Sequence, residues 1–221
     1  SQIFVVQSDY NPTKKTEINS EIAISNNDAN LFSNLDDNQN KAVAAKVSWQ
    51  QILIDKKWQL KSNINHEFVQ QNFQSEQGWE PVEFNRDWNL LTNNATKNFF
   101  QSELSLQNKT DDFVLYRFNS LNYTDTFKGI KHELQSKLNI KNTSFFMNGS
   151  LLENTSILEN NSFFRAKAKV EHSLKKVWLG AFINFETNNR KDINTKQFVN
   201  TSHRFKEYEG YVGIGDSTKI F

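Results

Sequence analysis

The stretch SFFRAKAKVEHSLKKVWLGAFINFETNNRKD, residues 162–192, alternates in polarity residue by residue. One set of positions is apolar (Phe164, Ala166, Ala168 and Val170), and the positions between them are charged (Arg165, Lys167, Lys169 and Glu171). Beyond Lys175 and Lys176 the alternation resumes at Val177. A period of two is that of a β-strand, whose successive side chains project to opposite faces. The stretch therefore predicts two antiparallel strands joined by a tight turn.

The same period recurs along most of the chain, whereas helical spacing of apolar residues is not sustained past residue 41. Predicted strands cover 41–54, 58–68, 98–107, 113–123, 131–140, 144–152, both halves of the opening stretch, and 204–215. Each is roughly ten to thirteen residues long, against about five or six in soluble sheets. We therefore predict an all-β, antiparallel up-and-down meander of roughly 8–12 strands, since segments of about ten residues suit a tilted bilayer crossing.

The connections between these strands support the same interpretation. Tight corners are predicted near 55–57, 108–112, 140–142 and 174–176, and longer polar stretches at 72–96, 124–130, 153–161 and 187–203. Outer-membrane barrels have short turns on one side and long loops on the other. This alternation predicts a transmembrane β-barrel, or a large part of one, over residues 41–221. Residues 1–40 are predicted to hold one strand (16–25) and an Asn/Asp-rich loop (26–40).

The two faces of such a strand have different surroundings in a membrane. A bilayer has no water to satisfy backbone groups, so a spanning sheet presents an apolar face to lipid and a polar face to a lumen. We therefore predict that Phe164, Ala166, Ala168 and Val170 face lipid and that Arg165, Lys167, Lys169 and Glu171 face the lumen. Aromatic residues gather near the predicted strand ends, as membrane-boundary girdles do, although aromatics also favour strands in general.

Composition narrows the classes of function. The chain has 26 Lys+Arg and 25 Asp+Glu, a net charge of +1, which gives no basic surface for nucleic acid. It has 0 Cys, so disulfides and thiolate chemistry are excluded. The sequence has no run of about 18 apolar residues, so it predicts no membrane-spanning helix. The first residues, SQIFVVQSD, lack the features of a signal peptide, so we expect a mature or excised segment.

No set of residues predicts a catalytic, cofactor or metal site. The four histidines (His66, His132, His172 and His203) lie on separate segments without ligand spacing. The pairs His172-Ser173 and Ser202-His203 suggest a hydrolase, but neighbours on one strand point to opposite faces. Glu80, Glu83, Arg86 and Asp87 in WEPVEFNRDWNL (79–90) are interpreted as the start of a strand with a salt-bridged rim. Asp28, Asp36 and Asp37 lack the regular spacing of a calcium loop.

Three segments carry a family resemblance: VEFNRDWNL (82–90), NLFSNLDDNQNKAVAAKVSW (30–49) and HRFKEYEGYVGIGDSTKIF (203–221). They resemble a large, poorly characterised outer-membrane β-barrel protein family of the Bacteroidota, whose members are several times longer than this chain. The resemblance implies a Gram-negative outer membrane and a place beside export machinery such as the type IX secretion translocon. It implies no catalytic residues, and it implies that the chain is a fragment. Phe221 resembles the terminal aromatic residue of barrel proteins.

The sequence thus predicts an outer-membrane β-barrel with a transport, export or scaffolding role and no catalysis. Its expected partners are outer-membrane lipid and other envelope or secretion proteins, with no nucleic acid and no cofactor. The alternative is a soluble extracellular β-sheet module that binds glycan or protein through aromatic faces. Solubility without detergent distinguishes the two.

Overall fold

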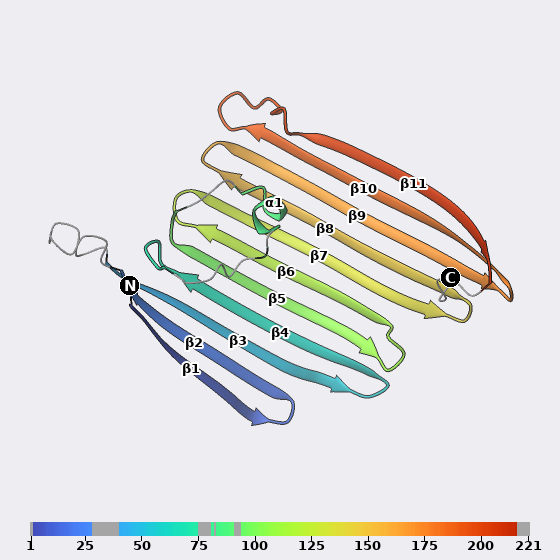
Figure 1. The fold of residues 1–221 in the computed structure, drawn as a ribbon, viewed down its shortest axis with the longest axis horizontal. Coiled ribbons are helices and arrows are strands. Elements are labelled where there is room, and N and C mark those ends of the chain that lie inside the picture. The colour runs from blue at the N-terminus through green and yellow to red at the C-terminus, as the bar shows by residue number, and fades with distance from the viewer. Residues whose placement is uncertain (1, 28–39, 75–80, 82, 91–93, 216–221) are drawn as a thin grey trace.

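Eleven strands make one antiparallel sheet in the part of the chain that the structure describes. The computed structural model describes residues 2–27, 40–74, 81, 83–90 and 94–215. The strands pair in chain order, so the sheet is an up-and-down meander (Figure 1). They are β1 (Gln2–Thr13), β2 (Thr16–Asn26), β3 (Lys41–Asp55), β4 (Trp58–Val69), β5 (Lys97–Asn108), β6 (Phe113–Tyr123), β7 (Phe127–Ile140), β8 (Thr143–Ser156), β9 (Glu159–Leu174), β10 (Val177–Asp192) and β11 (His203–Ile214).

The predicted hairpin of residues 162–192 corresponds to β9 and β10, which pair without a bulge. Val170 lies opposite Phe145 of β8 and Ala181 of β10. Because directly opposite residues project to the same side of a sheet, this register carries the alternation of one strand to its neighbours. The prediction of an all-β, antiparallel up-and-down fold is confirmed.

The sheet is open. β1 and β11 are its outer strands, and they do not pair with each other within the described residues. The predicted closure into a barrel is therefore not formed by these eleven strands. Their outer backbone groups are left without a sheet partner, and every residue of β1 is exposed.

The five connections that precede the even-numbered strands lie at one end of the strands, which we call the turn end. The other five lie at the opposite end, the loop end (Figure 1). At the loop end, the long connections predicted at 124–130 and 153–161 are wrong, because only 124–126 and 157–158 lie between strands. The polar residues there belong to the strands and extend the pairing between them. For example, the Asn161 and Asn154 amides lie 2.7 Å apart across β8 and β9.

The N-terminal region differs from the prediction of one strand and a loop. Residues 16–25 lie in β2, but β1 precedes it and pairs with it from Gln2 to Thr13. The period-two pattern is broken in β1, where Ile3, Phe4, Val5 and Val6 are consecutive, so the alternation does not mark it as a strand. Of the predicted loop 26–40, residues 28–39 lie outside the described residues.

At the other side of the sheet, β10 and β11 bring aromatic rings over glycines. Trp178 lies directly opposite Gly213, and Tyr211 lies opposite Gly180. A Cβ atom at either glycine would collide with the facing ring. The two rings themselves lie edge to face, with centroids 5.5 Å apart. Glycine at these positions lets the Trp178 ring cover the backbone of the outer strand β11 and the Tyr211 ring cover that of β10.

Candidate functional site: the polar face of the sheet

The two faces of the sheet differ in chemistry. We call the face that carries Arg165, Lys167, Lys169 and Glu171 the polar face. The face that carries Phe164, Ala166, Ala168 and Val170 is the apolar face. The register separates the two sets as the sequence predicts: Ala168 lies opposite Met147 and Ile183, whereas Lys167 lies opposite Asn148 and Asn184. Whether these faces meet lipid and a lumen stays a prediction.

The apolar face is exposed over the breadth of the sheet. Large side chains such as Ile22, Leu104 and Phe164 have exposed fractions of 54%, 45% and 45%. Charged strand residues on this face are confined to positions within four residues of the loop end. They are Lys41, Lys128, Glu153, Lys191, Arg204 and Lys206. The rest of the face, from there to the turn end, forms a band without Asp, Glu, Lys or Arg, which we call the apolar band.

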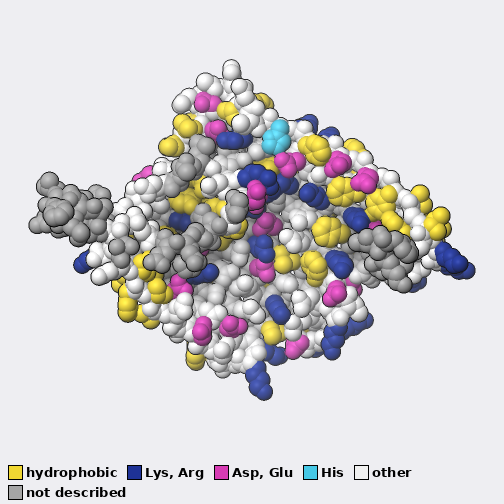
Figure 2. All heavy atoms as spheres, viewed as in Figure 1, with side chains coloured by type: hydrophobic (Ala, Val, Ile, Leu, Met, Phe, Trp, Pro, Cys, Tyr) yellow, Lys and Arg dark blue, Asp and Glu magenta, His cyan; other side chains and the backbone are white. Residues whose placement is uncertain are grey.

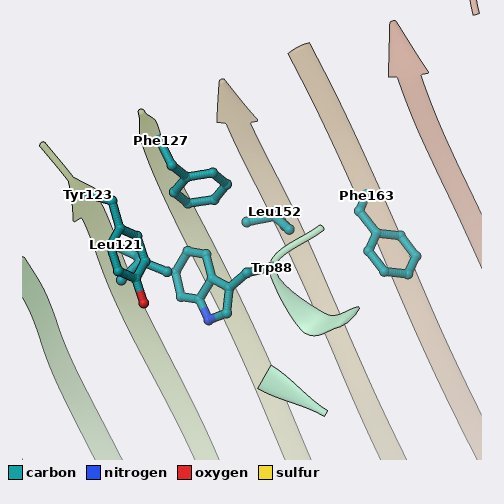
Figure 3. Close-up of a cluster of buried hydrophobic side chains, with 6 residues drawn as sticks. All are labelled: Trp88, Leu121, Tyr123, Phe127, Leu152 and Phe163. Carbon is teal, nitrogen blue, oxygen red and sulfur yellow. The ribbon is translucent and has the colours of Figure 1, made fainter. Parts of the chain in front are cut away.

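On the polar face, residues 83–90 of the β4–β5 connection fold back over the strands instead of starting a strand. The strand start predicted within residues 79–90 is therefore wrong for the described residues: Phe84–Asp87 form the single helical turn α1, which lies over the central strands towards the loop end (Figure 1). The predicted salt bridging is present, since Arg86 lies 2.9 Å from Glu83. Trp88 follows α1 and is only 3% exposed. Figure 3 shows its indole among side chains from four strands. These side chains are Leu121, Tyr123, Phe127, Leu152 and Phe163.

The Trp88 ring is held by both stacking and polar contacts. It lies edge-on to Phe99 and Phe127, with centroids 6.2 and 6.4 Å away. The Lys131 ammonium lies 5.7 Å from its centroid. The Asn154 amide donates a hydrogen bond of 2.7 Å to the Trp88 carbonyl. The hydrogen bond from Asn154 satisfies a carbonyl that would otherwise lie without a partner beside the buried indole.

Two further polar links fasten this connection to the distant strands β9 and β10. Arg165 Nη1 lies 2.9 Å from Asp87 Oδ1. The amides of Asn89 and Asn188 exchange two hydrogen bonds of 2.9 Å each. Sequence reasoning missed these roles, although Glu83–Arg86 and Phe84–Trp88 have helical i,i+3 and i,i+4 spacing. Both pairs are in contact, at 2.9 Å and at 6.2 Å between ring centroids.

A ladder of alternating charge crosses the polar face next to this connection. Arg117 of β6 contacts Glu103 of β5 at 2.6 Å and Glu133 of β7 at 3.4 Å. Glu133 also contacts Lys131 at 3.1 Å. Figure 2 shows Lys and Arg interspersed with Asp and Glu on the viewed face. Partly buried charges are stable here because each has an opposite charge in hydrogen-bonding contact.

The four predicted lumen-facing residues do not form one cluster. Arg165 reaches the β4–β5 connection, whereas Lys169 contacts Glu171 at 2.9 Å and lies 5.5 Å from the centroid of the Tyr211 ring. Lys167 is exposed beside them. The four residues therefore make separate charged and aromatic contacts along the polar face and do not converge on one point.

Three of the four histidines contact polar partners, and they do so on separate strands. His132 Nδ1 lies 2.8 Å from Tyr116 Oη, His172 Nδ1 lies 2.8 Å from Thr143 Oγ1, and His203 Nε2 lies 2.7 Å from Glu186. No three His, Cys, Asp or Glu side chains of the described chain are placed to hold a metal ion. Asp28, Asp36, Asp37 and Glu80 lie outside the described residues.

At the turn end, the Asp112 carboxylate fastens the β5–β6 connection. It accepts hydrogen bonds from Asn108 Nδ2 at 2.7 Å, from the Asn139 backbone at 2.7 Å and from Asn139 Nδ2 at 2.8 Å. The hydrogen bond from Asn108, and after it those from Asn139, lowers the pKa of Asp112 below its ordinary value of 3.8. The carboxylate thus ties β5, β6 and β7 together at this end.

Comparisons with known proteins add no relative: family models, curated proteins and solved structures were each searched, and none matches this chain. Within the described part of the chain, no helix has the length and apolar character needed to cross a membrane.

Proposed function

We propose that this chain forms part of the wall of a bacterial outer-membrane β-barrel with a transport, export or scaffolding role and no catalytic activity. The observation that carries the proposal is the apolar band. A face this broad that exposes large hydrophobic side chains is rare on soluble monomers. Hydrocarbon is the surrounding that such a face matches, and it would leave the polar face to water.

Strand length supports the proposal. The shortest strands, β2 and β6, have 11 residues, and the longest, β9 and β10, have 16. A tilted strand needs about 9–11 residues to cross the hydrocarbon core. Every strand is therefore long enough to span. The six charged residues of the apolar face would then lie at one boundary of the bilayer, beside the loop end.

A spanning sheet also needs its outer strands paired, because lipid offers no hydrogen bonds to a free edge. The proposal therefore includes further strands against β1 and β11, which copies of this chain supply to one another when it inserts alone. The β4–β5 connection would narrow or plug the water-filled side, with Trp88 as its anchor. The resemblance to the Bacteroidota family and its export machinery belongs to this proposal as well.

Folding with and without lipid tests the proposal. The urea-denatured chain is diluted into buffer alone and into phosphatidylcholine vesicles, and β-structure and protease resistance are measured. We expect both to appear only with vesicles. A monodisperse, folded chain in buffer without lipid or detergent would overturn the proposal and favour the soluble β-sheet module.

A further inference from the structure

Lysine is present in all five connections of the turn end. The connections contain Lys14-Lys15, Lys56-Lys57, Lys109, Lys141 and Lys175-Lys176, with Asp111 and Asp112 as the acidic residues. Eight lysines against two aspartates give these five connections a net charge of +6. All eight lysines are exposed. None forms an ion pair with a residue that the structure describes.

The connections of the loop end have the opposite charge. By sequence they contain eight acidic residues and two basic ones, Arg86 and Lys196, so their net charge is −6. The neighbouring strand residues of the apolar face add five basic residues and one acidic residue, so the separation of charge along the strand direction lies in the connections. Such a separation orients a molecule in the field of a charged surface.

The row of lysines begins where the apolar band ends. Exposed apolar residues adjoin the turns, among them Ile140 at 59%, Leu174 at 51% and Ile54 at 46%. Lysine suits such a boundary, because its aliphatic stem covers apolar surface while the ammonium extends into water. Neighbouring hairpins repeat every two strands, about 10 Å apart, so the positive charge runs as a line along the sheet.

We propose that the turn end binds the headgroups of anionic phospholipids and so sets which leaflet it faces. This inference rests on the proposed function, since it places the turn end at a bilayer surface. A long line of lysines without arginine suits a diffuse layer of phosphate charge, whereas recognition of defined carboxylates or phosphates favours the planar fork of arginine. An acidic protein partner is the competing occupant.

Lipid selectivity of the membrane-inserted chain tests the proposal. The chain is reconstituted in phosphatidylcholine, and electron spin resonance measures its association with spin-labelled phosphatidylglycerol relative to spin-labelled phosphatidylcholine. The test variant carries Lys14→Gln, Lys15→Gln, Lys56→Gln and Lys57→Gln. A matched variant carries Lys46→Gln, Lys61→Gln, Lys137→Gln and Lys196→Gln, which removes the same charge from the polar face and the loop end.

We expect the unaltered chain to prefer phosphatidylglycerol by about fivefold, the order expected when a lipid headgroup contacts one lysine near a membrane surface. The preference should fall by about half in the test variant, because four of the eight turn-end lysines remain. It should largely disappear in ~1 M salt, where the screening length is about 3 Å. The matched variant should retain it. A chain that inserts without any preference, or an equal loss in both variants, would overturn this inference alone and favour the acidic protein. A chain that enters no vesicles would overturn the proposed function, and this inference with it.

Discussion

Arg165 and Asp87 are 78 residues apart in sequence, yet Nη1 of one lies 2.9 Å from Oδ1 of the other. This ion pair joins the middle of β9 to the connection that follows β4, across the polar face. Its side chains are 25% and 34% exposed, so solvent screens the attraction in part. The pair therefore positions the connection more than it stabilises the sheet.

A double-mutant cycle of Arg165→Ala and Asp87→Ala measures this coupling. We expect an interaction free energy of about 0.5–1 kcal/mol, the upper part of the range for exposed pairs. Urea unfolding of the lipid-embedded chain is the measurement. Lys167→Ala is the comparison variant, because Lys167 lies on the same face without an ion pair in the described structure, and it should show no coupling to Asp87.

Trp88→Ala should destabilise the sheet much more than the loss of the ion pair. The indole is 3% exposed and fills the space among side chains of β6, β7, β8 and β9, so its removal leaves a cavity. Truncation of a buried tryptophan costs about 3–5 kcal/mol. Proteolysis of the β4–β5 connection should accelerate in parallel. Trp49→Ala, in a half-buried position on β3, is the comparison, and a loss as large as that of Trp88→Ala would contradict the anchoring role.

The neighbours Ile183 and Asn184 test the assignment of the two faces. Both lie near the middle of β10, with Ile183 on the apolar face and Asn184 on the polar face beside Glu207. In a bilayer, Ile183→Arg should cost about 2–4 kcal/mol, because it places a cation in hydrocarbon. Asn184→Arg should be nearly neutral. Equal free energies of folding into vesicles for the two variants would mean that the apolar face does not meet lipid.

Asp112→Asn should change the acid sensitivity of the chain. The folded-state pKa of Asp112 is lowered by hydrogen bonds from Asn108 and Asn139, so its contribution is complete above the unfolded pKa. This contribution to the free energy of unfolding disappears as the pH falls through the folded-state pKa. At neutral pH the variant should therefore be the less stable, and the difference should shrink below about pH 3.8. Urea unfolding from neutral to strongly acidic pH measures it, and a constant difference would contradict the assignment.

Gly213 and Gly210 on β11 make a matched pair for the aromatic contact. A Cβ at Gly213 would meet the Trp178 ring, whereas one at Gly210 would meet nothing within 4 Å. Gly213→Ala should destabilise the chain by about 1 kcal/mol or more, since the ring must move. Gly210→Ala should stabilise it by roughly 0.4–1 kcal/mol through a smaller unfolded-state entropy. Thermal unfolding distinguishes the signs, and a gain at Gly213 would show that the ring does not cover the backbone.

The alternation of side chains accounts for how much was predictable from the sequence. A period of two is a local property of each segment, so it located β2 to β11 and separated Arg165 from Phe164 without knowledge of any partner strand. The pattern failed to locate strand residues that pair with a neighbouring strand but do not alternate in polarity. β1 has consecutive apolar residues and is a strand because β2 supplies its hydrogen bonds. The polar residues near Asn154 looked like a loop, yet their amides bond across β8 and β9.

The amino-acid sequence by itself determined an antiparallel meander with one apolar and one polar face, because the backbone pleat converts alternation directly into two surfaces. Only the tertiary structure decided that Trp88 inserts among four distant strands, that Arg165 meets Asp87, and that β1 and β11 remain apart. Those outcomes depend on shape and register between segments far apart in the chain, which no local spacing encodes.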